Sequence, residues 1–158
     1  MDNIRTLQGD VIARDLRIAI SASRFNDAIV ENLVRGAVDA LLRHGASEKQ
    51  IEIIRVPGAY DLPFVARRVA ASKRCDAIVA LGAVIRGGTP HFDYVCNQCA
   101  SGLARAADET GVPIAFGVLT TDTIEQAVER AGTKAGNKGA DAALVAIELA
   151  NLMRRLDL

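Results

Sequence analysis

The sequence is poor in aromatic residues and carries no excess charge of either sign. Phe and Tyr make up 4% of its 158 residues and Trp is absent, so the core must consist of aliphatic side chains and alanine. Basic and acidic residues number 19 each, which argues against a surface for nucleic acid or an anionic membrane. No apolar run has the length of a membrane span. With 50% hydrophobic residues, the chain suits one domain, residues 1–158, with a substantial core.

Cysteine is also scarce, and its pattern predicts no disulfide framework. Cys75, Cys96 and Cys99 are odd in number and lack framework spacing. The last two spell a CxxC, but they lie in a helical pattern that also holds Val95, which favours core packing over redox or metal use. Two distant histidines and scattered carboxylates offer no metal-ligand spacing. The N-terminus lacks the regions of a signal peptide, and we expect a soluble, cytoplasmic protein.

Apolar runs and helical patterns alternate four times along the chain. The predicted strands cover residues 18–21, 51–56, 77–81 and 113–119. Because these strands are continuous apolar runs with short connections, they predict a parallel sheet with helices on both faces, a three-layer α/β/α sandwich. Residues 1–16 alternate only weakly, and a lone strand there would need a sheet edge to pair with.

Local signals predict where two of the helices begin. Asn26 is a good N-cap for the first helix, and Asp122 with Glu125 forms a capping box for a short helix that runs to Arg130. Residues 132–139, GTKAGNKG, are expected to be a linker to the last helix. Arg130 and this linker form a basic segment that need not lie at the strand ends. Either the last helices fold back, or the segment serves a neighbouring subunit, and we favour the second.

The stretch 81–94, LGAVIRGGTPHFDY, holds the densest group of candidate functional residues. Ligands of such sheets bind beyond the carboxyl ends of the strands, where this stretch emerges. Its glycines resemble a P-loop, but Gly88 stands where that motif needs lysine, which argues against a nucleoside triphosphate. Backbone N–H groups near Gly88 and Thr89, beside a helix start, suit a smaller phosphate.

Four further side chains are candidates, each with a plain alternative. The dipole at a helix start favours a neutral His91 that can transfer protons, although capping or packing is the alternative. His44 lacks such neighbours and is expected to serve the C-terminal end of its helix. Phe25 follows a strand end and either packs under the helix or stacks on a flat ligand. Tyr60 and Asp61 occupy the next loop, where Asp61 either caps a helix or bonds a ligand.

Four segments, in order and covering nearly the whole chain, resemble the 6,7-dimethyl-8-ribityllumazine synthase family. They are SRFN from residue 23, PGAYDLP from 57, LGAVIRGGTPHFDYVC from 81 and AFGVLTTDTIEQAVERAGTKAGNKG from 115. The resemblance implies a flavodoxin-like fold. It also implies a cofactor-independent condensation of 5-amino-6-(D-ribitylamino)uracil with 3,4-dihydroxy-2-butanone 4-phosphate. The products are the lumazine, phosphate and water, in the penultimate step of riboflavin biosynthesis.

The same resemblance assigns roles by matched position. His91 is the proton-transfer residue, and Gly88, Thr89 and Arg130 hold the phosphate with Lys138 nearby. The pyrimidine and ribityl groups are bound by Phe25, Ala59, Tyr60, Asp61, Ala83, Val84, Ile85 and Phe116. Phe116, Arg130 and Lys138 come from the adjacent subunit. Asp61 stands where the family usually has Glu, so its contact with the ligand is expected to be longer or water-mediated.

The resemblance also implies a homo-oligomer with active sites between subunits. The family forms pentamers, some of which build icosahedral shells of sixty subunits, and its N-terminal segment can add a strand to a neighbour's sheet. The uninterrupted ERAGTKAGNKG resembles the shell-forming members. Two rival functions are a non-catalytic flavin or lumazine carrier, which needs no His91 beside a phosphate site, and a flavodoxin-like interaction domain. The latter would want clustered acidic residues at the strand ends, where Asp61 is alone.

Overall fold

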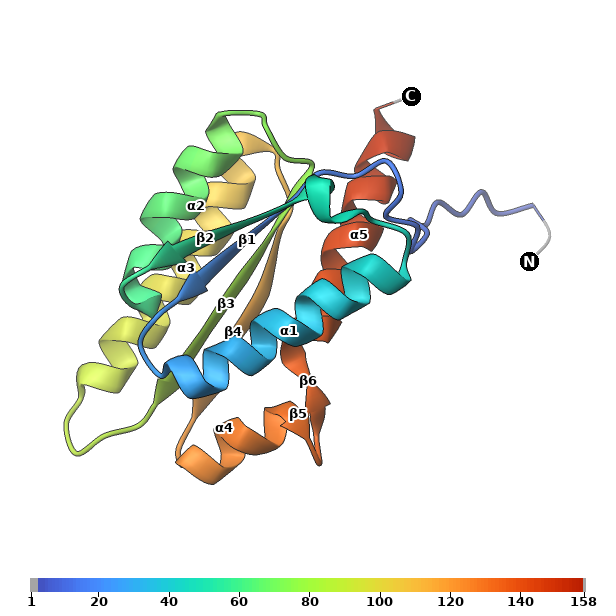
Figure 1. The fold of residues 1–158 in the computed structure, drawn as a ribbon. Helices are drawn as coiled ribbons and strands as arrows, with labels where there is room; N and C mark the ends of the chain where they lie inside the picture. The colour runs from blue at the N-terminus through green and yellow to red at the C-terminus, as the bar shows by residue number, and fades with distance from the viewer. Residues whose placement is uncertain (1–2, 158) are drawn as a thin grey trace.

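The computed structural model describes residues 3–157, which form a four-stranded parallel sheet between two layers of helices (Figure 1). The strands are β1 (Ile18–Ser23), β2 (Ile51–Val56), β3 (Ala77–Ile85) and β4 (Ile114–Thr121), in the spatial order β2-β1-β3-β4. One face carries α1 (Asp27–Arg43) and α5 (Lys138–Leu156), and the other carries α2 (Leu62–Ala71) and α3 (His91–Thr110). The predicted three-layer α/β/α arrangement is confirmed.

The two faces of the sheet have separate cores. Leu33, Leu41 and Ile147 pack on the α1 and α5 face, where alanines fill most of the remaining space. The backbones of α1 and α5 approach each other closely there. A Cβ on Gly139 of α5 would clash with the carbonyl of Leu33 in α1. On the α2 and α3 face, Leu62 and Leu103 cover the sheet. Both cores are aliphatic, as the scarcity of aromatic residues predicts.

Strand β3 is longer than predicted, and its last residues extend past the end of its pairing with β1. It continues past Leu81 to Ile85, paired with β4 up to Ile85 and Thr121. Its pairing with β1 ends earlier, at Ala22 and Leu81. The glycine at position 82 was expected in a loop, but it lies within the strand because β4 supports that segment. Beyond Leu81, β3 therefore has a partner on one side only.

The first helix begins after Asn26 as predicted, but the capping bonds of both predicted helix starts need correction. Asn26 precedes α1 in the left-handed conformation, with φ 61°, and its side chain makes no cap hydrogen bond. Helix α4 (Ile124–Arg130) is capped by Thr123, whose hydroxyl accepts the N–H of Gln126 at 3.1 Å. The capping residue is thus one position later than predicted, because the carboxylate of Asp122 is engaged by Arg86 instead.

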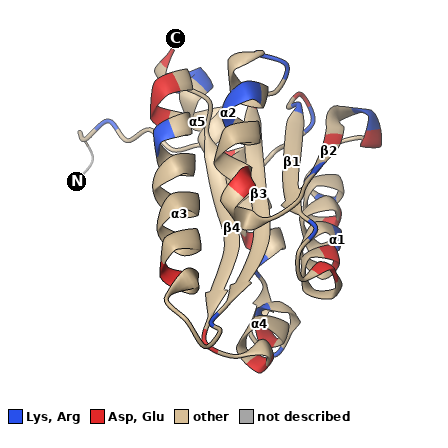
Figure 2. Ribbon diagram, turned by 90° about the vertical axis from the view of Figure 1, so that its left-hand side faces the viewer, with Lys and Arg blue, Asp and Glu red and all other residues tan. Residues whose placement is uncertain are grey.

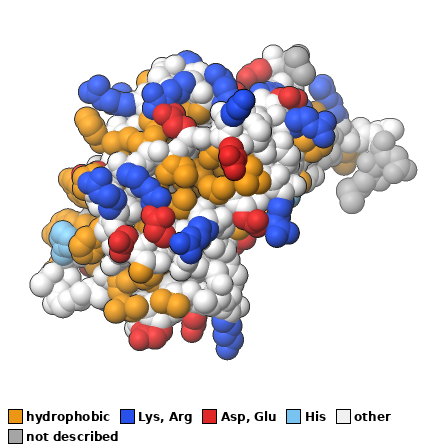
Figure 3. Space-filling view, in the orientation of Figure 1, with side chains coloured by type: hydrophobic (Ala, Val, Ile, Leu, Met, Phe, Trp, Pro, Cys, Tyr) orange, Lys and Arg blue, Asp and Glu red, His pale blue; other side chains and the backbone are white. Residues whose placement is uncertain are grey.

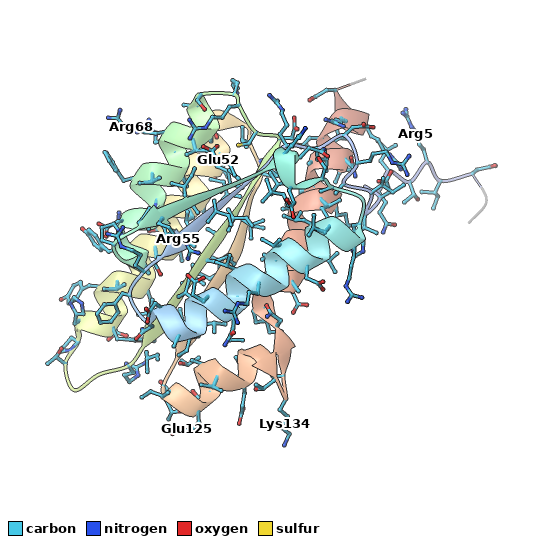
Figure 4. All side chains as sticks on the ribbon, viewed as in Figure 1. Arg5, Glu52, Arg55, Arg68, Glu125 and Lys134 are labelled. Atoms are coloured by element: carbon cyan, nitrogen blue, oxygen red, sulfur yellow. The ribbon has the colours of Figure 1, made fainter. Side chains whose placement is uncertain are left out.

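The predicted linker after α4 is a small antiparallel hairpin, β5 (Ala131–Thr133) and β6 (Gly136–Asn137). Together with α4 it lies beyond the carboxyl end of β4, beside α1 (Figure 1). Asn137 fastens it there: its amide donates to the carbonyl of Asn32 in α1 at 2.9 Å, and its oxygen caps α5 at Gly139 and Ala140. The side chain of Lys134 points away from the hairpin (Figure 4).

Residues 3–17 contain no strand, so the expected N-terminal strand is not formed within this chain. Ala13 and Leu16 are buried, while Ile4 is 69% exposed. The amide of Asn151 in α5 donates to the carbonyls of Asp10 and Ile12 and holds this segment on the helix. None of the helices within residues 3–157 is long and apolar enough to cross a bilayer. Acidic and basic side chains are interspersed over the ribbon (Figure 2).

Candidate active site

A cavity of about 620 Å³ opens where β1, β2 and β3 end, beside the start of α3. Three aromatic side chains contribute to its wall, together with main chain from three loops and the end of β3. Its lining consists of Phe25, Asn26, Gly58, Ala59, Tyr60, Asp61, Ala83, Val84, Ile85, Gly87, Thr89, His91, Phe92 and Val95. Its volume is that of a site for one or two small molecules.

The floor of the cavity includes the unpaired edge of β3. Even-numbered residues of β3 face β4, as the bonds from the N–H of Ile78 to Pro113 and from Arg86 to Thr121 show. The main-chain groups of Ala83 and Ile85 therefore face the other side, where β1 has already ended. Such groups need partners when they are shielded from water. The carbonyl of Ala83 accepts from the side chain of Asn26 at 2.8 Å, so the N–H and carbonyl of Ile85 are the groups that can recognise a flat ring with both donors and acceptors.

Phe25 stands at the rim of the cavity rather than under helix α1. Its side chain is 72% exposed, so the core-packing alternative is wrong. The turn that carries it is tied to the end of β2, because the N–H groups of Arg24 and Phe25 donate to the carbonyls of Val56 and Pro57. An exposed ring held at a rim suits stacking on a planar ligand.

The loop after β2 supplies Tyr60 and Asp61. Tyr60 is 56% exposed at the cavity. The Oδ2 atom of Asp61 accepts the N–H of Gly58 at 2.9 Å, so this carboxylate closes its own loop and does not cap α2. One oxygen is occupied by the backbone, which limits how far the short side chain reaches into the cavity.

The loop between β3 and α3 leaves space for an anion. A Cβ built on Gly87 or Gly88 meets no atom within 4 Å. The 20-residue helix α3 begins at His91, whose N–H lies 3.4 Å from the hydroxyl of Thr89. The exposed N–H groups of a first helical turn attract negative charge. His91 lies at the same place, exposed and on the cavity wall.

Arg86 anchors this loop to its surroundings. Its guanidinium lies 2.8 Å from Asp122, 3.6 Å from Asp93 and 4.3 Å from the centre of the Phe92 ring. The hydrogen bond that Arg86 donates to the carboxylate of Asp122 raises the pKa of Arg86. The end of β3 is thereby linked to the first turn of α3 and to the loop after β4. These contacts restrain the glycine-containing segment from both ends.

The model of the 6,7-dimethyl-8-ribityllumazine synthase family matches residues 15–154, which is nearly the whole chain. The chain belongs to this family. It is a lumazine synthase family enzyme of riboflavin biosynthesis, as the resemblance of the four sequence segments predicts. The parallel α/β sheet, with its order β2-β1-β3-β4, agrees with the expected flavodoxin-like arrangement.

Most residues that were matched to lumazine synthase site positions lie around the cavity. The lining contains Phe25, Ala59, Tyr60, Asp61, Ala83, Val84, Ile85, Thr89 and His91. Gly88 belongs to the same loop but does not line the cavity. The structure thus assembles residues from three of the four segments of the sequence at one edge of the sheet.

Three matched residues lie outside this cavity. Phe116 is on β4, beyond β3, and is 49% exposed. Arg130 bends back on its own helix, where its guanidinium donates to the carbonyl of Gln126 at 3.0 Å. Lys138 pairs with Asp141 at 3.2 Å. A single chain of this lumazine synthase family member therefore does not bring these three side chains into the cavity.

Sequence reasoning missed several residues of the cavity wall. Phe92 and Val95 follow His91 at helical spacing, and this spacing could have placed them beside it. Gly58 and Gly87 flank residues that were predicted. Asn26 had been assigned to a helix cap, and nothing in the local sequence indicates its contact with β3.

The cysteines and the second histidine lie apart from this site or serve the core. Cys75 and Cys99 are buried, and the prediction of core packing is confirmed for Cys99. Burial raises the pKa of Cys75 to about 11 and that of Cys99 to about 12, so neither is a ready thiolate. Within residues 3–157, no group of three or more His, Cys, Asp or Glu side chains has the arrangement of a metal site. His44 bonds the carbonyl of Ala40 at 2.8 Å near the end of α1, as predicted.

Proposed function

We propose that the cavity condenses 5-amino-6-(D-ribitylamino)uracil with 3,4-dihydroxy-2-butanone 4-phosphate without a cofactor. The observation that carries this proposal is that one volume of about 620 Å³ is bordered by an exposed aromatic ring, an unpaired strand edge and a glycine loop that ends in a histidine. These parts suit a flat heterocycle, a phosphate and proton transfer, respectively. Holding both substrates in one cavity supplies acceleration through proximity.

In this proposal the pyrimidine lies against Phe25 and the edge of β3. The ring of Phe25 stacks on the heterocycle, while the main-chain groups of Ile85 bond its donors and acceptors. Ala59, Tyr60 and Asp61 border the ribityl chain. Because the carboxylate of Asp61 already accepts from Gly58, its free oxygen reaches the ribityl hydroxyls directly only at the near end and otherwise through water.

The phosphate occupies the loop of Gly88 and Thr89, and His91 handles the protons. The amine of the pyrimidine attacks the ketone, a Schiff base forms with loss of water, phosphate leaves, and the second amine closes the ring with loss of a second water. Each step moves a proton between neighbouring atoms, so one imidazole at the cavity wall can serve several of them. The start of α3 stabilises the departing phosphate by charge.

A neighbouring subunit completes the site with Phe116, Arg130 and Lys138. What supports this step is that all three are at least partly exposed and none lines the cavity of its own chain. The guanidinium of Arg130 offers bidentate bonds to a phosphate, which an N-terminal helix turn alone does not provide. The assembly is a homopentamer, and the hairpin without insertion favours its further association into a shell of sixty subunits.

The same assembly gives the N-terminal segment its partner. Strand β2 ends the sheet of a single chain, with Ile53 on it 44% exposed. A free strand edge favours pairing with an added strand. Residues near Ile4 and Leu7 of a neighbour supply that strand. Figure 3 shows further hydrophobic side chains at the surface between charged groups, as expected for a subunit of an oligomer.

The test is to mix the two substrates with the protein and to follow the lumazine optically and free phosphate in parallel. Equal amounts of both products above the spontaneous rate support the proposal. A carrier or an interaction domain would bind the lumazine or nothing, and would release no phosphate. Light scattering on the same sample distinguishes a pentamer from a shell.

A further inference from the structure

Asn26 has an unusual backbone conformation at the wall of the cavity. With φ 61° and ψ 44° it is one of two non-glycine residues with positive φ among residues 3–157, the other being Lys73. Side chains other than those of Asn and Asp rarely tolerate this region. Asn26 immediately precedes a 17-residue helix, yet its side chain does not cap that helix. Its conformation therefore serves some other contact.

That contact is a hydrogen bond across the sheet. The Nδ2 atom of Asn26 donates to the carbonyl of Ala83 at 2.8 Å, in a half-buried position. Pairing between β1 and β3 has ended at Ala22 and Leu81, so this carbonyl has no β1 main-chain partner beyond that point. The side-chain amide of Asn26 takes the place of the next ladder bond. It joins the turn after β1 to the strand that forms the cavity floor.

Phe25 lies between this bond and a second anchor. On the side of β2, the N–H groups of Arg24 and Phe25 donate to the carbonyls of Val56 and Pro57, at 2.8 and 3.1 Å. On the side of β3, the only bond the turn makes among the described residues comes from Asn26. The ring of Phe25 is 72% exposed, so packing does little to hold it. Its direction depends on the turn, and the turn depends on both anchors.

We propose that Asn26 is a positioning residue for the pyrimidine: its bond to Ala83 sets the distance between the ring of Phe25 and the edge of β3. A heterocycle that stacks on the first and bonds to the second requires both at a fixed separation. This inference rests on the proposed stacking role of Phe25. In this inference Asn26 affects binding of the pyrimidine through the position of Phe25.

A double-mutant cycle tests the inference, with fluorescence titration of 6,7-dimethyl-8-ribityllumazine into the assembled protein as the readout. Phe25→Ala is expected to raise Kd about 10–100-fold through lost stacking. Asn26→Ala is expected to raise it about fivefold. The double variant should bind no more weakly than Phe25→Ala alone, because the bond has no ring left to position.

The outcomes separate the two proposals. If Phe25→Ala leaves Kd unchanged, the stacking proposal fails. If Phe25→Ala weakens binding but the two effects multiply in the double variant, Asn26 acts without Phe25 and the positioning role is wrong. An unchanged Kd in Asn26→Ala, beside a weakened Phe25→Ala, also overturns the positioning role while the stacking role stands.

Two other substitutions separate the hydrogen bond from the backbone conformation. Asn26→Gly keeps the left-handed conformation without strain, and Asn26→Asp keeps the size but replaces the donor with a carboxylate that faces an oxygen. Asn26→Gly should bind about as weakly as Asn26→Ala, and Asn26→Asp at least as weakly. Wild-type binding by either would show that the amide bond is dispensable and would overturn the inference. These variants also answer the objection that alanine unfolds the turn.

Steady-state kinetics distinguish a positioning role of Asn26 from a purely structural one. Asn26→Ala should raise KM for the pyrimidine about fivefold and leave KM for the butanone phosphate unchanged. A general loss of folded protein would lower kcat with both KM values intact, which would contradict positioning. Asn32→Ala is the matched control, because Asn32 also donates its amide to a backbone carbonyl, that of Ala28 at 3.2 Å, but lies outside the cavity.

Discussion

The two faces of the sheet differ in how much space they leave. On the α1 and α5 face, a Cβ on Gly139 or Gly36 would collide with α1 or with Asn137, so the backbone there has no freedom to shift. On the α2 and α3 face a Cβ on Gly102 would likewise collide with Pro63, but beyond the strand ends the loop of Gly87 and Gly88 is open and a cavity of about 620 Å³ lies beside it. Arg130 and Lys138, before and after the hairpin, lie outside the cavity of the same chain. The division explains why the open face alone is half of the proposed site.

The strongest test of this difference between the two faces is to remove the guanidinium of Arg130, which lies outside the cavity of its own chain. Arg130→Ala should lower kcat/KM about 10²–10³-fold, because it removes a preorganised charge from the departing phosphate. The lumazine carries no phosphate for this guanidinium to bind, so binding of the lumazine should change little. The measurement is lumazine formation against substrate concentration.

Mixing decides whether that charge comes from a neighbour. Subunits of Arg130→Ala and His91→Ala, unfolded and reassembled together in equal amounts, should recover about one quarter of the wild-type activity, since a quarter of the shared sites combine two intact halves. Reassembly of each variant alone is the control. Absence of recovery in verified mixed oligomers would place both halves of the site in one chain.

On the open side, His91→Ala should slow turnover about 10–100-fold without abolishing it. In the proposed reaction the imidazole transfers protons, but the proximity of the two bound substrates survives its loss. Single-turnover rates across the neutral pH range measure the effect. Complete inactivity of a correctly assembled variant would mean that His91 does more than transfer protons.

Stability should respond unequally to the same substitution on the two faces. Gly139→Ala should reduce the free energy of unfolding by about 1–3 kcal/mol, because its Cβ forces α5 away from the carbonyl of Leu33. Gly88→Ala, whose Cβ meets no atom within 4 Å, should stay within about 0.5 kcal/mol of the wild type. Urea titration of both variants measures the difference. Equal values would contradict the contrast between the faces.

The smallest expected effect concerns the buried thiol of Cys99 on the open face. Burial raises its pKa from 9.0 to about 12 in the folded chain, so the unfolded chain loses the proton first. The stabilisation is complete below pH 9 and falls above it, by about 1.4 kcal/mol per pH unit until the folded thiol titrates. Cys99→Ala should lack this part of the decline between pH 9 and 10 in thermal or urea unfolding. An identical slope in both proteins would be evidence against it.

The sequence allowed the elements and the cavity to be predicted because both depend on local pattern. Continuous apolar runs identify buried parallel strands, and the carboxyl ends of such strands meet at one edge, which brought Phe25, Asp61 and His91 together. The glycine at position 82 misled the prediction of β3, because the support that keeps this segment extended comes from β4, more than thirty positions away.

The features that could not be predicted depend on side chains whose hydrogen-bond partners lie far away in the sequence. Asn26 is of a residue type that favours helix N-caps. Its side-chain amide instead donates to the carbonyl of Ala83, 57 positions later in the sequence. The carboxylate of Asp122 likewise bonds to Arg86 instead of capping α4, and Thr123 caps that helix. Local propensity cannot decide between two partners when one of them becomes available only in the folded chain.

The unequal lengths of β1 and β3 also bear on how this enzyme tolerates mutation. The groups exposed along the edge of β3 at Ile85 belong to the peptide backbone, and every residue except proline supplies the same N–H and carbonyl. A substitution there changes the size of the wall but leaves the bonding pattern intact. The proposed functions of His91 and Arg130, like the stacking by Phe25, each depend on one side chain and are lost when it is replaced. Sequence drift should therefore erode the main-chain part of the recognition at Ile85 more slowly than these side-chain functions.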